Sequence, residues 1–223
     1  HHRHSDTPED THSPRHKGVI YAHNGWVIDC KNDDLREDMI KDFLKYPELR
    51  FIDKHHWFPP LCLALLMFYL GSWEGLVIGF VWSTCLLWQG TFVINSFTHL
   101  WGKRDFPSTD DSKNSFIFAM VTLGEGWHNN HHFYQASCRQ GFYWWQIDIT
   151  YYILKILSLF RIVWDIKEPP QKILDQRFKN AEEAAANPPA CAVAMEEALA
   201  AAAAKEADTN LDAAEAEDKH AAA

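Results

Sequence analysis

The feature that most constrains the fold is an almost unbroken apolar run over residues 57–101, in which Glu74 is the only formal charge. At about 1.5 Å per helical residue, such a run can cross a hydrocarbon core of about 30 Å twice. We therefore predict a transmembrane helical hairpin over 57–102, with helices at about 57–72 and 76–98. The glycines and the carboxylate at 71–75 mark the turn between them. A re-entrant hairpin buried within the protein is the alternative.

Basic residues flank the run on both sides. Lys45, Arg50 and Lys54 precede it, and Lys103 and Arg104 follow it. By the positive-inside rule, both ends of the hairpin face the cytosol. The formal net charge of −9 argues against a nucleic-acid partner. Five cysteines without a CxxC pair indicate a reducing compartment rather than a disulfide scaffold.

The rest of the chain has the composition of helices and loops, so the predicted fold class is all-α. Residues 1–34 are polar and rich in turn formers, and 35–56 have the periodicity of an amphipathic helix. Residues 103–180 are predicted to form a cytosolic helical cap, and 181–223 an Ala/Glu-rich tail that is disordered or weakly helical.

Within the cap, two helices are expected. One extends over about 114–136. The other, over 142–164, is amphipathic and carries charged residues, so it lies along the membrane interface or packs on the cap.

Histidines in helical register predict a metal site. His128, His131 and His132 stand at i, i+3 and i+4, which places three imidazoles on one helix face. Asn95 and His99 are likewise one turn apart. Neutral imidazole is a common ligand of iron, copper and zinc. With the pair His1 and His2 at the start of the chain, the histidines exceed what one ion needs, which indicates two metal ions side by side.

Three segments resemble the membrane fatty acyl desaturases. His1-His2-Arg3-His4-Ser5-Asp6-Thr7 is similar to the end of their second histidine box, and Asn95-Ser96-Phe97-Thr98-His99-Leu100-Trp101-Gly102 resembles their NSxxHxxG segment. The stretch from Gly124 to His132 resembles GEGxHNxHH, the third box of the Δ9, stearoyl-CoA desaturase-like branch. The resemblance covers about 1–167, and it identifies the chain as the C-terminal portion of such an enzyme.

The resemblance implies a di-iron centre and dioxygen as co-substrate. The residues that it makes metal ligands are His1, His2, His99, His128, His131 and His132, with Asn95 binding through water. No catalytic residue beyond these ligands is expected. The reaction implied is insertion of a cis double bond, at Δ9, into a long saturated acyl-CoA. The electron donor is cytochrome b5 or ferredoxin. The active site faces the cytosol or stroma, at the endoplasmic reticulum in a eukaryote.

Substrate contacts follow from the same resemblance. Thr91 and Phe92 match positions that shape the kink of the acyl tunnel, and Trp26 is expected to line it. Core packing is the alternative role for Thr91 and Phe92.

Two departures from the family pattern limit the prediction. The first histidine box is absent, so the chain alone is expected to be inactive. Trp26 is followed by an acidic stretch rather than by the Arg-Lys pair of the family pattern. An acyl-lipid substrate therefore remains an alternative to acyl-CoA. A di-iron hydroxylase and a non-catalytic metal-binding membrane protein are the remaining alternatives.

Overall fold

The computed structural model describes residues 2, 4–32 and 40–202. All regular secondary structure in these ranges is helical. Extended pairing within them is limited to isolated antiparallel bridges, which join Asn114 to Lys103 and to Trp127. The all-α prediction is confirmed. His1 and residues 35–39 of the predicted amphipathic helix lie outside the described residues.

The N-terminal segment is more helical than predicted. It contains α1 (Pro14–Lys17), the π-helical turn η1 (Tyr21–Gly25), α2 (Trp26–Ile28) and the 3-10 turn η2 (Cys30–Asn32). Proline at the first helical position of α1 favours a helix start, because its φ is already helical and its missing N–H needs no partner there. The prediction of a loop over 1–34 is therefore wrong for these residues.

The amphipathic helix before the hairpin is shorter than predicted. After the 3-10 turn η4 (Phe43–Lys45), the helix α3 begins at Pro47 and ends at Lys54. A residue before proline is pushed out of the helical region, and Tyr46 is extended, with φ −100° and ψ 108°. The single helix predicted over 35–56 is therefore wrong at 46, where the backbone leaves the helical conformation.

The apolar run forms α4 (Phe58–Glu74), the π-helical segment η5 (Gly75–Trp82), α5 (Ser83–Ser96) and the 3-10 turn η6 (Phe97–His99). The 42-residue stretch from Phe58 to His99 is the one helical stretch among the described residues that is long and apolar enough to cross a membrane. Its side chains lie mostly at the surface of the protein, as lipid-facing side chains would.

The stretch is not one straight helix, because the backbone breaks at Gly71 and Ser72. Gly71 has φ −139° and Ser72 has φ 57° and ψ −142°, both outside the helical region. A Cβ atom on Gly79 would lie 2.8 Å from Sδ of Met67, although residues so far apart in a straight helix would be separated by about 18 Å. The chain therefore reverses at the break, and η5 packs back against α4.

The predicted helix over 114–136 is wrong as one element, because it is divided into α6 (Phe116–Val121) and α7 (His128–Phe133). Between them, Gly124 has φ 127°, which favours glycine. Gly126 lies so close to α6 that a Cβ atom would be 2.0 Å from the backbone nitrogen of Ala119. These two glycines turn the chain, so α7 starts a new helix at the first histidine.

The remaining helices cover the cap and the beginning of the tail. The amphipathic helix is α8 (Ile149–Leu159), which is shorter than the predicted 142–164, and it is capped by the side chain of Asp148. It is followed by α9 (Gln171–Leu174) and α10 (Ala181–Ala186), and residues 190–202 are also helical. The tail contacts the cap, since the backbone N–H of Cys191 donates to the carbonyl of Thr109 at 3.2 Å.

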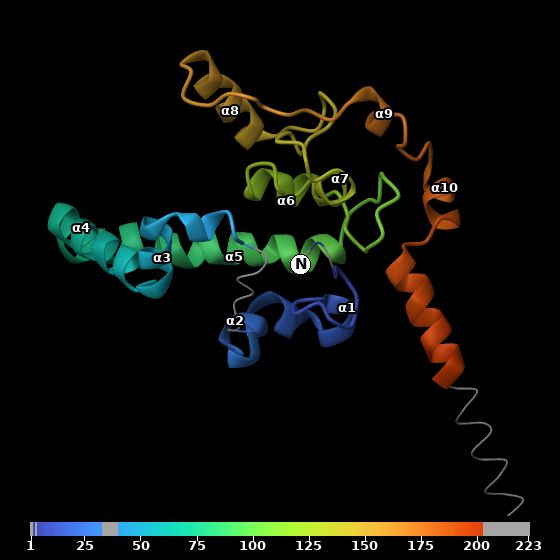
Figure 1. Cartoon of the computed structure of the whole chain (residues 1–223), viewed down its shortest axis with the longest axis horizontal. Helices are drawn as coiled ribbons and strands as arrows, with labels where there is room; N and C mark the ends of the chain where they lie inside the picture. Colours follow the sequence, from blue (N-terminus) through green and yellow to red (C-terminus); the bar gives the residue numbers. More distant parts are fainter. Residues whose placement is uncertain (1, 3, 33–39, 203–223) are drawn as a thin grey trace, which may run out of the picture.

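The end of α5 is the meeting point of the fold. In Figure 1, α1 and α2 lie on one side of it, while α6 and α7 lie on the other. Contacts join α5 both to η1 and to α6. Residues from three distant parts of the sequence therefore surround His99, at the end of the apolar stretch.

The geometry of the hairpin predicts that alanine substitutions at two of its glycines have opposite effects on the free energy of unfolding. A Cβ atom on Gly75 would lie 2.2 Å from the carbonyl oxygen of Met67, whereas one on Gly90 would have nothing within 4 Å. Gly75→Ala should therefore lower the free energy of unfolding by about 1–3 kcal/mol, since backbone atoms must move. Thermal unfolding in detergent micelles would measure it.

Gly90→Ala is the matched control, and it should raise stability by about 0.5–1 kcal/mol, because alanine is the better helix former. Equal stability of the Gly75 variant and the unmodified protein would contradict the close approach of η5 to α4.

Candidate metal centre

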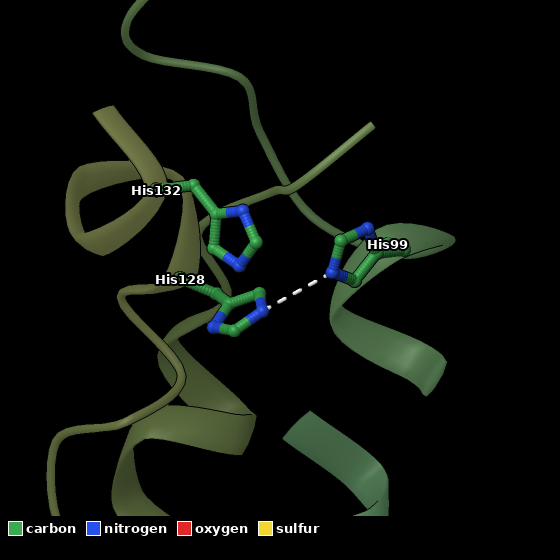
Figure 2. Close-up of side chains that lie close together, drawn as sticks. All are labelled: His99, His128 and His132. Atoms are coloured by element: carbon green, nitrogen blue, oxygen red, sulfur yellow. Dashed lines mark hydrogen bonds between the residues drawn. The ribbon is translucent and has the colours of Figure 1, made fainter. Parts of the chain in front are cut away.

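Three buried histidines from two elements converge at the end of the apolar stretch. His99 closes η6, and His128 and His132 lie one turn apart on α7 (Figure 2). One ring nitrogen from each lies within 4.8 Å of the others. Nε2 of His128 is 3.1 Å from Nε2 of His99. Nitrogens that face one another at this distance form a donor set into which a cation fits.

A second pair of imidazoles adjoins this group. Nε2 of His131 is 3.1 Å from Nε2 of His2. The ring of His2 is also 4.7 Å from the ring of His132, so the two groups are neighbours. The chain therefore places a second pair of imidazoles beside the buried group, and the presence of two metal ions stays a prediction. His1 cannot be placed, since it lies outside the described residues.

Two buried carboxylates hold the outer nitrogens of the central histidines. Nδ1 of His99 is 2.6 Å from Oδ2 of Asp6, and Nδ1 of His132 is hydrogen-bonded to Oδ2 of Asp110. A carboxylate partner fixes the proton on Nδ1 and turns the Nε2 lone pair toward the other histidines. This arrangement is typical of histidines that bind metals.

Neither carboxylate is among the functional residues predicted from the sequence. Asp6 lies within the second-box segment, and this was the available signal for it. Asp110 lies in the polar connector between the hairpin and α6, and nothing in its spacing indicates that it meets His132.

The imidazoles of His2, His128 and His131 are held in the neutral form that metals bind. Burial, and then the neighbouring His132, lowers the pKa of His2 and of His131 to about 4. Burial followed by the surrounding histidines places the pKa of His128 well below its usual value. At neutral pH a cation therefore does not compete with protons for these three side chains.

The fit to a metal is supported by the chemistry of the donor set. A donor set made mainly of imidazoles suits iron, copper or zinc rather than calcium or magnesium. The centre is thus able to hold a transition metal.

The other predicted site residues lie around this centre. Asn95 is half-buried on α5, one turn before His99, and its role as a water-mediated ligand stays a prediction. The rings of Trp26 and Phe92 meet edge to face at 6.2 Å. Thr91 is exposed, and its hydroxyl donates to the carbonyl of Leu87. The substrate-binding roles of Trp26, Thr91 and Phe92 are not tested by these contacts.

Comparison with known proteins identifies the family. No family model matches the chain. Over 77% of its length, however, it is 35% identical to "Icosanoyl-CoA 5-desaturase" of Limnanthes douglasii and 35% identical to "sn-1 stearoyl-lipid 9-desaturase" of Anabaena variabilis. "Delta-9 acyl-lipid desaturase 2" of Arabidopsis thaliana is 34% identical over the same share. The chain belongs to the fatty acyl desaturase family.

The matches cover 49%, 63% and 56% of these three relatives, so the chain spans about half the length of the curated relatives it matches. These identities confirm the resemblance to the desaturase family. The histidine groups of this desaturase-family chain are able to bind metal, and its apolar stretch is one that can cross a membrane.

Asp110 provides a test of the metal centre. In Asp110→Asn, the carboxylate that holds Nδ1 of His132 is replaced by an amide, which can present either an acceptor or a donor. Such a loss of orientation should weaken Co²⁺ binding by about 10- to 100-fold. Competition with a chromophoric chelator would measure the Co²⁺ affinity of the protein encoded by the longest reading frame that contains this chain.

Asp53→Asn, at an exposed position on α3, is the charge-matched control and should bind Co²⁺ like the unmodified protein. Unchanged affinity in the Asp110 variant would mean that His132 does not bind the cation.

Proposed function

We propose that this chain is the di-iron part of a membrane fatty acyl desaturase, which inserts a cis double bond into a long saturated acyl chain. The observation that carries the proposal is the buried meeting of His99, His128 and His132 at the end of an apolar stretch. An oxidant at that place lies where an aliphatic chain can reach it from the bilayer.

The proposed reaction balances with an external reductant. Two hydrogens leave adjacent carbons of the acyl chain, two electrons and two protons arrive from outside, and dioxygen is reduced to two waters. When two irons are bound, they supply the activation of dioxygen that this chemistry needs. Cytochrome b5 or ferredoxin is the proposed electron donor.

The residues of the chain have distinct tasks in this proposal. The six histidines (His1, His2, His99, His128, His131 and His132) hold the metals, and Asn95 contacts one of them through water. Asp6 and Asp110 orient two of the imidazoles. Thr91 and Phe92 shape the bend in the path of the acyl chain, and Trp26, whose ring contacts that of Phe92, lines this path.

Acyl-CoA desaturation at Δ9 is the substrate class that we propose first. The third-box segment carries the resemblance to that branch, and three relatives are named for acyl-CoA substrates, although at position 5. We also propose that the active site faces the cytosol, or the stroma of a plastid, and in a eukaryotic cell with a cytosolic site the membrane is the endoplasmic reticulum.

Acyl-lipid desaturation is the second candidate, and one observation favours it. The segment after Trp26 carries Asp29, whose carboxylate accepts hydrogen bonds from the Tyr21 hydroxyl at 2.6 Å and the Lys31 backbone at 3.2 Å. A negative charge at that position repels the phosphates of coenzyme A. The relatives named "sn-1 stearoyl-lipid 9-desaturase" act on such lipid substrates.

The reaction can be tested in a desaturase-deficient host. We expect the longest reading frame containing this chain to produce a new cis bond near carbon nine, located by mass spectrometry of the lipids. His131→Ala should abolish it, because one of the imidazoles that faces His2 is lost. His56→Ala, at an exposed position before the hairpin, should retain the activity.

Two outcomes would contradict the proposal. A hydroxylated chain instead of an alkene would assign the centre to oxygen insertion. Activity that survives His131→Ala would remove this residue from the metal ligands.

In membranes, turnover of added acyl-CoA before its transfer to lipid would separate the two substrate classes.

A further inference from the structure

A fully buried side chain next to the first histidine of α7 is connected to the metal centre by a path of hydrogen bonds. Asn129 is 0% exposed. Its Oδ1 accepts from the backbone N–H groups of Asp105 and Phe106, at 2.8 and 2.7 Å. Its Nδ2 donates to the Phe106 carbonyl at 3.2 Å and to Oγ of Ser108 at 2.9 Å. Both donors and both lone pairs of the amide are thereby used.

The segment that Asn129 holds is the one that carries Asp110. The hydroxyl of Ser108 donates to the carbonyl of Asp110 at 3.2 Å. The hydroxyl and backbone N–H of Ser112 donate to Oδ1 of Asp110, at 2.5 and 3.2 Å. The other carboxylate oxygen of Asp110 accepts from Nδ1 of His132. The path therefore leaves α7 at Asn129 and returns to it at His132, one helical turn later.

We infer that Asn129 is a positioning residue for the metal centre. It fixes the backbone of residues 105–108, so that Asp110 stands where it can hold Nδ1 of His132 and direct Nε2 toward His99 and His128. The inference rests on the proposed metal centre alone, whichever reaction the centre performs. A ligand held by a rigid partner loses less freedom when it binds a cation.

The chain offers a matched control in the next residue. Asn130 is also 0% exposed, and its amide is hydrogen-bonded to Asn114, Gln140 and Gln146. In the described ranges, the hydrogen-bond partners of Asp110 are other residues, namely Ser108, Ser112 and His132. Substitution of either asparagine breaks several buried hydrogen bonds, so both should lower the unfolding temperature. Only substitution of Asn129 should change the binding of a metal.

Cobalt binding by the protein encoded by the longest reading frame that contains this chain would test the inference. We expect Asn129→Ala to weaken Co²⁺ binding about tenfold and to alter the d–d absorption bands, which report the ligand geometry. Ser108→Ala removes one link of the same path with less loss of packing, and it should shift the affinity in the same direction. Asn130→Ala should keep the affinity within about twofold and leave the bands unchanged.

A double-mutant cycle separates positioning from a general loss of stability. In the Asp110→Asn background, Asn129→Ala should cause no further loss of cobalt affinity, because the path has already been cut. Additive losses, or unchanged cobalt binding in both the Asn129 and Ser108 variants, would overturn the inference. No cobalt binding by the unmodified protein would overturn it together with the metal centre.

The test of the proposed desaturation reaction is separate from the test of the role of Asn129. If the cycle is non-additive as expected, yet no double bond forms in the host, the positioning role of Asn129 stands and the desaturase proposal falls.

Discussion

The carboxylate–imidazole hydrogen bonds are the interactions on which the rest of the centre depends. Asp6 and Asp110 come from segments that are distant in sequence, and each fixes one imidazole that is itself nearly inaccessible to water. Burial alone would raise the pKa of Asp6, but the hydrogen bond from His99, the charge of that imidazole and the hydrogen bonds from Asp111 and Ser13 together outweigh burial and leave the pKa below its usual value. Asp6 thus anchors the N-terminal segment to the end of the hairpin through His99, and Asp110 anchors the connector to α7 through His132.

The location of this centre follows from the surrounding fold. The apolar stretch ends at His99, and the chain on either side of it folds back to cover that end (Figure 1). Charged and amide side chains there are buried among their own hydrogen-bond partners, whereas the apolar side chains of α4 and α5 remain at the surface. Polar groups inside and apolar groups outside are the reverse of a water-soluble domain, and this distribution suits a protein whose apolar surface faces lipid.

Much of the fold and of the metal centre was predictable from periodicity and spacing in the sequence. The features that were not predictable depend on contacts between residues that are distant in the sequence. Helical spacing of His128 and His132 predicted their shared face, and the run of apolar residues predicted the helices that end at His99. The division of the helix before His128 was missed, because it requires Gly126 to lie against α6. The part played by Asp110 was missed for the same reason, since its partner lies 22 residues away.

Each of the first five residues of the short helix α7 faces the metal centre or contacts another part of the protein. His128 and His132 face the centre, His131 meets His2, and Asn129 and Asn130 are bonded to separate parts of the cap. A surface helix normally keeps one side on which mutations are harmless. Here every direction around the axis is occupied, so we expect substitutions at any of these five positions to disturb a contact, whether or not the residue binds a metal.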